Sequence, residues 1–345
     1  MSILLEKITQ AQMIDFSRFF KVERPNYAGN TLFPNMKTQS LTASYERLCD
    51  GATIPTIAQV HALDAEANIG TRPSFTKVEL EKLYIKEKIN LGERERLLLK
   101  GGVSAPSEIM NFIYNDIARL SESVLARMEL AKMEAFSTGK MTVKENNLNF
   151  TVDYKVPSEN FETKNWATAS HDILGDIRKW VDLLADKGVV VNYAYTSRKI
   201  VNILLQNEAI QKAINGAPKA GVLLTLTQLN GLFSEHFGFT ILVDNNAVYQ
   251  YQKANGSLES KKFFDVNKFI LFQSVNGAVG TGLWGATPEE DDYSPFDSAI
   301  SDAYITSVTW STPDPVTTWT KAAGLMIPVI PNPNALFIAT VATGA

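Results

Sequence analysis

The glycines of residues 280–285 have a spacing that could serve cofactor chemistry. Their G-x-G-x-x-G pattern follows an apolar stretch, as it does in loops that bind a dinucleotide. In such loops a helix opens at the glycines, and its N-terminus binds the pyrophosphate. Here Ala286, Thr287 and Pro288 lead instead into an acidic segment. We therefore keep a dinucleotide-dependent enzyme that uses this loop as an alternative hypothesis. The sequence that follows the glycines argues against that hypothesis.

A second candidate for chemistry is the acidic run at residues 289–292, with the sequence Glu-Glu-Asp-Asp. Carboxylates are the ligands that hard cations such as Ca²⁺ prefer. However, consecutive side chains point in different directions, and no loop with the spacing of an EF-hand surrounds the run. We therefore interpret residues 289–292 as a solvated acidic loop.

Serine, histidine and cysteine residues form no convincing catalytic or metal site. Residues 234–236, Ser-Glu-His, combine three catalytic residue types, but neighbours on a helix do not face each other. His61 and His171 have no partner at metal-binding spacing, so we interpret both as surface or capping residues. Cys49 is the single cysteine, which excludes an intrachain disulfide and suits a reducing cytoplasm. We predict no catalytic, cofactor-binding or metal-binding residues, no cofactor and no enzyme activity.

Length and composition predict a folded protein with more than one lobe. The chain has 345 residues, whereas a single core usually stops growing at about 250–300 residues. Hydrophobic residues make up 45% and charged residues 20%, both near the average of globular proteins. The formal charge is -4, and no block of Lys and Arg forms a stripe that would neutralise phosphates. Tight nucleic-acid binding is therefore disfavoured.

Neither a membrane span nor a signal peptide is expected. Residues 1–21 lack a basic start followed by a long apolar run. Residues 322–345 carry no charge, yet Pro328, Pro331 and Pro333 would leave backbone groups unsatisfied in lipid. Residues 269–288 are interrupted by polar residues and glycines.

The sequence pattern of the first part of the chain predicts an arm, a loop and one long helix. Prolines and short apolar patches without sustained periodicity predict an extended arm with a loop over the first hundred residues, followed by strand structure near residues 78–91. Residues 106–138 predict a helix that Ser104 or Ser107 caps and that Gly139 ends. At a rise of about 1.5 Å per residue it would be roughly 50 Å long, a strut. Its apolar residues recur at three- and four-residue steps: Ile109, Ile113, Ile117, Leu120, Val124, Met128 and Ala131.

The second part of the chain predicts a hairpin and a compact α/β lobe. Residues 141–156 alternate around Asn146-Asn147 as in a hairpin, and Asn255-Gly256 is typical of a type I′ turn. The tail, residues 303–345, is expected to be extended and to join this hairpin. The lobe should contain helices over 173–184, 200–214 and 226–233 and strands over 189–195, 239–243, 247–252 and 268–273.

Over nearly its whole length the chain resembles the lambda-type major capsid proteins of tailed phages. Each matching motif is short, and it is their order and spacing together that carry the resemblance. In chain order they are Leu32-Phe33-Pro34; Gly70-Thr71-Arg72-Pro73; Tyr84-Ile85-Lys86-Glu87-Lys88-Ile89 with Gly92-Glu93; Trp166-Ala167 with Asp172-Ile173-Leu174-Gly175-Asp176-Ile177; Gly188; Asp244 with Tyr249 and Asn255-Gly256; Lys268-Phe269-Ile270-Leu271-Phe272; and Gly280, Gly282, Gly285, Pro288 and Glu289.

The resemblance implies an α+β chain with the Hong Kong 97 capsid fold. It implies an N-terminal arm (1–40), an E-loop (41–78), a peripheral domain (79–158) with its spine helix (106–138), an axial domain (159–300) and strands that return to the peripheral domain (301–345). The stretches before Ser104 are too poor in apolar residues to build a core of their own. We therefore expect adjacent copies of the chain to stabilise them, which offsets the entropy lost on ordering.

The function implied by the resemblance is that of a major capsid protein. Such a chain self-assembles into hexamers and pentamers of an icosahedral head shell, which encloses double-stranded DNA without sequence-specific binding. It is expected in the virion, after assembly in the cytoplasm of the host bacterium. Besides further copies of the chain, the implied partners are a portal, a separate scaffolding protein and a decoration protein.

Two alternatives in the structural class stay open from the sequence alone. An encapsulin-type bacterial compartment shares the fold and would enclose a cargo enzyme instead of DNA. A phage tail or adaptor protein would form tubes or rings rather than closed shells.

Overall fold

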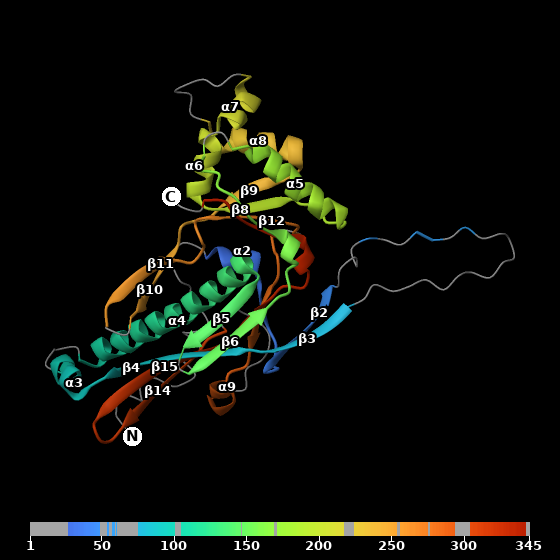
Figure 1. Ribbon diagram of the computed structural model, residues 1–345. Helices are drawn as coiled ribbons and strands as arrows, with labels where there is room; N and C mark the ends of the chain where they lie inside the picture. Colours follow the sequence, from blue (N-terminus) through green and yellow to red (C-terminus); the bar gives the residue numbers. More distant parts are fainter. Residues whose placement is uncertain are drawn as a thin grey trace.

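The computed structural model places a compact lobe above a long helix and a second sheet, with a two-stranded ribbon that leaves the body at one side (Figure 1). None of its helices, in the residues it describes, is long and apolar enough to cross a membrane. The described residues are 27–48, 54, 57–58, 60, 75–100, 105–145, 147–168, 171–216, 224–253, 256–274, 277–293 and 304–342.

Helix α4 (Ala105–Thr138) is the longest element, and it confirms the helix predicted over residues 106–138. It ends at Gly139, whose φ of 67° is the left-handed conformation in which glycine often terminates helices. The predicted apolar face is buried from Ile117 to Ala131, while the side chains of Ile109 and Ile113 lie outside the described residues.

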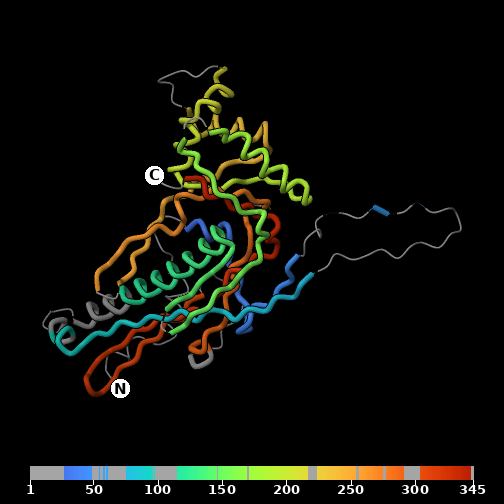
Figure 2. Tube along the Cα trace, in the orientation of Figure 1, coloured from blue at the N-terminus to red at the C-terminus, as the bar shows by residue number. Residues whose placement is uncertain are grey.

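A five-stranded sheet, here called the lower sheet, packs against α4. Ala322 and Met326 on one face of β15 contact Val124 of the helix, and the glycine between them lets the helix approach closely. Figure 2 shows β4 and β15 side by side although they are far apart in the sequence. The strands are β1 (Asn35–Lys37), β13 (Thr281–Gly285), β15 (Thr317–Val329), β14 (Thr306–Thr312) and β4 (Leu83–Leu91), which pairs with the other edge of β15.

The lobe contains the second five-stranded sheet, here called the lobe sheet, and the predicted helices. In sheet order its strands are β7 (Phe161–Thr163), β16 (Leu336–Thr340), β12 (Lys268–Phe272), β8 (Tyr193–Thr196) and β9 (Thr240–Val243). The helices are α5 (Ile173–Asp186), α6 (Arg198–Gln206), α7 (Glu208–Asn215) and α8 (Leu226–Phe237).

Strand β12 joins the lobe to the rest of the molecule because both of its faces are buried, as its continuous apolar sequence indicates. Phe269 and Leu271 belong to the core between the lobe sheet and its helices. Ile270 and Phe272 belong to a second core, the junction core, which also contains Phe136 from the end of α4. The rings of Phe136 and Phe272 meet edge to face at 5.5 Å between centroids.

Residues 27–37 and strand β4 pack against their own chain, so our expectation that everything before Ser104 depends on adjacent copies is wrong for these two segments. Helix α2 (Ala28–Leu32) lies on α4, and β1 pairs in parallel with β13. Leu32 and Phe33 are buried in the junction core. These two large apolar side chains supply the anchor that the sequence pattern did not reveal.

Three two-stranded ribbons lie outside the two five-stranded sheets. Strands β2 (Thr42–Leu48) and β3 (Phe75–Glu81) form the ribbon that leaves the body, and β10 (Val248–Gln252) pairs with β11 (Leu258–Lys262). The predicted hairpin is confirmed as β5 (Lys140–Glu145) and β6 (Leu148–Asp153). Helices α3 (Glu93–Lys100) and α2 have no counterpart among the elements predicted from the sequence.

Other expectations need correction. The helix expected over 200–214 is two helices, because Asn207 adopts an extended conformation and caps α7 by accepting from the Ile210 N–H group. β8 begins at Tyr193 rather than at residue 189. The Asn255-Gly256 turn lies partly outside the described residues, although Gly256 has the positive φ expected there.

The tail does not join the β5–β6 hairpin, whose strands pair only with each other among the described residues. β14 and β15 enter the lower sheet, and β16 enters the lobe sheet beside β12. β13 lies in the lower sheet although it precedes residue 300. Strand pairing therefore crosses the boundary expected at residues 300 and 301, because sheet partners are chosen by long-range packing.

Candidate functional site

The glycines of residues 280–285 serve packing and not a cofactor. Gly282 and Gly285 lie within strand β13, not in a turn that opens a helix. A Cβ atom on Gly280 would meet the carbonyl oxygen of Val329, and one on Gly282 would meet Cε of Lys132 at 3.0 Å. Atoms of the chain itself fill the space that a pyrophosphate would need, which contradicts the dinucleotide alternative.

The acidic run is not a solvated loop at Glu289 and Glu290, and that interpretation is wrong for both residues. They begin the short helix α9 (Pro288–Tyr293) and are buried. Glu290 pairs with Nζ of Lys37 at 2.8 Å. Glu289 Oε1 accepts from Nζ of Lys321 at 2.5 Å and from the hydroxyl of Tyr84 at 2.5 Å.

These contacts tie three strands of the lower sheet to α9. Burial alone would raise the pKa of Glu289, but the hydrogen bonds from Lys321 and Tyr84 outweigh it and lower that pKa. The partner lysines come from β1 and β15, far from residue 289 in the sequence, so no local pattern predicted them. The side chains of Asp291 and Asp292 lie outside the described residues.

The serine and histidine candidates are not brought together. Ser234, Glu235 and His236 are exposed on α8 and point in different directions around the helix. His61 lies outside the described residues. Within the described ranges no group of three or more His, Cys, Asp or Glu residues could hold a metal ion.

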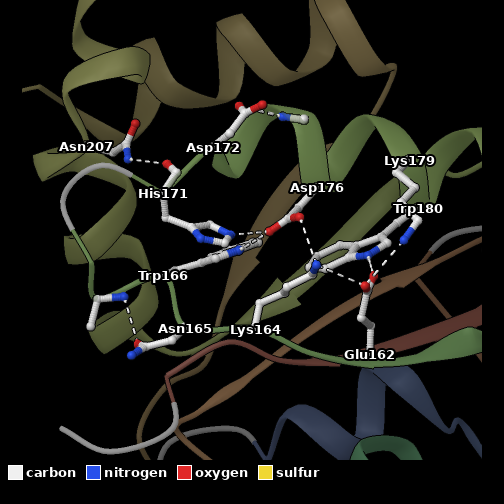
Figure 3. Close-up of polar contacts among 12 residues, drawn as sticks. Glu162, Lys164, Asn165, Trp166, His171, Asp172, Asp176, Lys179, Trp180 and Asn207 are labelled. Carbon is white, nitrogen blue, oxygen red and sulfur yellow. Dashed lines mark hydrogen bonds and ion pairs between the residues drawn. The ribbon is translucent and has the colours of Figure 1, made fainter.

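His171 belongs to a polar cluster that positions the start of α5 (Figure 3). Asp172 caps the helix by accepting from the Gly175 N–H group at 2.9 Å. One turn later Asp176 accepts from the indole N–H of Trp166 at 3.0 Å, and its Oδ2 lies 2.6 Å from Nε2 of His171. Asp172, and not His171, is the residue that caps the helix, and His171 contributes its ring to the cluster.

Glu162 holds the neighbouring tryptophan in the same way. It accepts from the indole N–H of Trp180 and pairs with Lys164 at 3.1 Å (Figure 3). Burial would raise the pKa of Glu162, but the bonds from Trp180 and Lys164 outweigh it and lower that pKa. The rings of Trp166 and Trp180 stack at 5.5 Å between centroids, so the two carboxylates orient the aromatic core of the lobe.

We predict that Asp176→Ala lowers the free energy of unfolding by about 1–3 kcal/mol, because the N–H of buried Trp166 is left without its acceptor. Denaturant unfolding followed by tryptophan fluorescence measures this change. Asp182→Ala, at an exposed position of the same helix, is the control and should change stability by less than about 0.5 kcal/mol. Equal effects of the two substitutions would contradict this account of the cluster.

The β2–β3 ribbon presents an acidic outer face. Thr42 pairs with Glu81, Ser44 with Glu79 and Glu46 with Lys77, and cross-strand partners share a face. All six of these side chains are exposed, whereas Ala43 on the opposite face is buried against the body. Farther along the chain, the side chains of Ile57 and Val60 are 96% and 99% exposed. The ribbon therefore presents acidic side chains, and the segment between its two strands carries apolar side chains that the described part of the chain does not cover.

The lower sheet presents a basic and aromatic face on the side away from α4. We call it the outer sheet face, and it is formed by Tyr84, Lys86, Lys88, Trp310 and Trp319. The rings of Trp310 and Trp319 stack across β14 and β15 with centroids 6.4 Å apart. Nζ of Lys88 lies 4.4 Å from the Trp319 ring, a cation–π contact. Strand register decides which of these side chains share a face, so the outer sheet face could not be predicted from the sequence.

Comparison with known proteins identifies the family of the chain. A family model described as "Phage major capsid protein E" matches residues 20–341. The chain belongs to this family. It is therefore a structural protein of the phage virion that builds the capsid shell, and the match gives the encapsulin-type alternative no additional support. No curated protein matches the sequence.

Solved structures support the same fold for this phage major capsid protein. A protein assigned as the capsid protein of a prophage in E. coli CFT073 has a TM-score of 0.61 at 15% identity, covering 97% of this chain and 99% of that one. A phage-related protein from Bordetella bronchiseptica RB50 has a TM-score of 0.54 at 12% identity, covering 96% and 97%. The predicted Hong Kong 97 capsid fold is confirmed.

Proposed function

We propose that this capsid protein assembles through hexamers and pentamers into a closed icosahedral head shell around double-stranded DNA. The observation that carries the proposal is the β2–β3 ribbon, which leaves the body, together with Ile57 and Val60 in the segment between its strands, whose side chains are almost completely exposed. Exposed apolar side chains on an extended segment are stabilised when another molecule covers them. In a shell made of one chain, that molecule is the adjacent copy.

The parts of the chain receive roles in this proposal. Residues 1–40 form the N-terminal arm and 41–78 the E-loop, whose described base is the β2–β3 ribbon. Residues 79–158, with α4 as the spine helix, form the peripheral domain together with strands returning from 301–345, and residues 159–300 form the axial domain. Sheet pairing supports one refinement: β13 works with the peripheral domain and β16 with the axial domain.

The remaining partners follow from the same proposal. The shell incorporates a portal, is built on a separate scaffolding protein and binds a decoration protein, and assembly takes place in the cytoplasm of the host bacterium. The chain acts as a structural protein and not as an enzyme. Its formal charge of -4 supports a container that releases its DNA, because a surface that neutralised many phosphates would retain it.

Charge complementarity indicates which surfaces meet between copies. The outer face of the ribbon carries Glu46, Glu79 and Glu81 with one lysine, whereas the outer sheet face carries Lys86 and Lys88. Opposite charges of this kind fix the register of an interface and disfavour wrong partners. We therefore place the ribbon of one copy on the outer sheet face of its neighbour, where Ile57 and Val60, between the strands of the ribbon, cover Trp310 and Trp319.

A charge exchange tests this contact. Lys86→Glu combined with Lys88→Glu should prevent the formation of closed particles, because acidic side chains then face each other at every copy of the interface. Adding Glu79→Lys and Glu81→Lys to the same chain should restore particles. Electron microscopy and sedimentation measure particle yield, and circular dichroism verifies that each subunit is folded.

The restored chain separates the proposed contact from a general effect of charge. If the quadruple variant assembles no better than the variant with Lys86→Glu and Lys88→Glu alone, the two surfaces do not meet. Unchanged assembly of the double variant would lead to the same conclusion. The matched control is Lys261→Glu combined with Lys262→Glu on β11, which makes the same change in net charge at exposed positions outside the proposed contact.

A further inference from the structure

Two charged residues are buried where the N-terminal segment meets the long helix. Glu129 and Lys132 lie one turn apart on α4, and their residues are only 3% and 1% exposed. Charged side chains are almost never buried this completely unless they have specific partners. Both side chains find those partners in residues 27–37, which form α2 and β1.

Glu129 holds the start of α2. Its Oε1 accepts from the N–H group of Gly29 at 2.9 Å. A Cβ atom at position 29 would collide with Oε2 of the same carboxylate, so only glycine allows this approach. Oε2 itself is buried and has no hydrogen-bond partner in the part of the chain that the structure describes. The carboxyl group is therefore half satisfied, which makes its ionised form costly.

Lys132 holds the segment on both sides of Phe33. Its Nζ donates to Oδ1 of Asn30 at 3.1 Å and to Oδ1 of Asn35 at 2.7 Å. The stem passes over Gly282, where a Cβ atom would lie 3.0 Å from Cε of the lysine. The ammonium group of Lys132 thus links α2 and β1 to the helix, and its stem packs against β13.

The other titratable groups near this pair are themselves engaged. Burial raises the pKa of Glu129, and the charge of Asp244, which follows β9, adds to that increase. Oδ1 of Asp244 accepts from the hydroxyl of Tyr195 on β8 at 2.7 Å, and Oδ2 accepts from the Asn246 N–H group at 2.8 Å. Burial, followed by the charge of Asp244, raises the pKa of Tyr195, so its hydroxyl stays protonated. Glu129 and Lys132 are the charged groups that residues 27–37 enclose at this contact.

We propose that Glu129 and Lys132 form a proton-controlled anchor, which sets how firmly residues 27–37 are held against α4. When the segment is docked, both side chains are enclosed by it. When it lifts away, both reach water. The equilibrium between these two states must then depend on the protonation of the pair.

The direction of the dependence follows from burial. Burial raises the pKa of Glu129 from 4.5 to about 7, so between these values the docked state holds a proton that the released state lacks. Acidification from neutral pH therefore strengthens docking. Burial lowers the pKa of Lys132 from 10.5 to about 8, so above this value the docked state holds one proton fewer. Docking is then weakest near neutral pH and strengthens on both sides.

Hydrogen exchange of the full-length chain tests the anchor. Exchange protection of a peptide covering residues 27–37, corrected for the intrinsic pH dependence of exchange, should increase by up to about tenfold per pH unit between about pH 7 and pH 5. Glu129→Gln keeps an acceptor for Gly29 but cannot ionise. In that variant the increase should disappear, and protection at neutral pH should exceed that of the unchanged chain.

A substitution of Lys132 tests the alkaline half of the predicted pH dependence independently. Lys132→Met keeps most of the side-chain volume and removes the ammonium group, so the increase expected between about pH 8 and pH 10 should disappear. Peptides from β15 serve as the internal reference and should not show the same profile. The proposal would be overturned if the exchange protection of residues 27–37 decreased as the pH is lowered from neutral to about 5. It would also be overturned if the Glu129→Gln variant showed the same pH dependence of protection as the unchanged chain.

Discussion

Replacing Ile57 and Val60 by aspartate should abolish shell formation and leave the subunit folded. The two side chains are 96% and 99% exposed, so the isolated subunit gains nothing from them. In the shell each would be covered by a neighbour, and an unpaired buried charge is strongly destabilising there. The defect is repeated at every contact of the shell, so the expected outcome is loss of particles rather than a lower yield.

Size-exclusion chromatography with light scattering should show unassembled subunits for this variant, and thermal unfolding should match that of the unassembled parent chain. The control is the double variant Ile57→Val with Val60→Ile. It keeps both positions apolar and should assemble normally. Particles formed by the aspartate variant at the parental yield would contradict the proposed role of the ribbon.

The second large effect is expected in the junction core. Phe272→Ala should lower the free energy of unfolding by about 3–5 kcal/mol, because it removes a fully buried ring and leaves a cavity. The ring contacts Phe136 of α4 and stacks on Tyr193 of β8 at 5.8 Å, so its loss removes part of the packing between the lobe and the spine helix. Denaturant unfolding of the unassembled subunit measures the change.

Phe150→Ala is the matched control for this core substitution. Phe150 lies on the β5–β6 hairpin, and 36% of it is exposed. Truncating it should therefore change the free energy of unfolding by no more than about 1 kcal/mol. If both substitutions had equal effects, the junction core would not be what joins the lobe to the helix.

Elements whose signal is local were predictable from the sequence. The apolar residues of α4 recur over 34 residues, and Gly139 marks its end, so both length and limits were predicted well. The β5–β6 hairpin and the helices of the lobe also follow from local periodicity. The division between α6 and α7 was missed because it depends on one residue, Asn207, whose side chain caps the second helix.

Features that depend on partners distant in the sequence could not be predicted. The burial of Glu289 and Glu290 requires Lys321 and Lys37, which only the folded sheet brings near. The docking of residues 27–37 depends on the close approach of Gly29 to Glu129, and neither residue signals it locally. Strands β13 and β16 occupy sheets on the other side of the expected boundary for the same reason.

The candidate surfaces were predictable only in outline. The poor core of the early segments correctly indicated a ribbon that leaves the body. The acidic and basic faces emerge from strand register, because the pairings of Glu79 with Ser44 and of Trp310 with Trp319 decide which side chains share a face. A shift of one residue would move every such side chain to the opposite face.

A cryo-electron microscopy map of particles formed by the unchanged chain tests the central claim most directly. The proposal predicts closed shells in which the β2–β3 ribbon of each subunit lies across the outer sheet face of an adjacent copy, with Ile57 and Val60 covered. Tubes or open sheets, or a ribbon folded back on its own subunit and leaving the neighbour untouched, would contradict it.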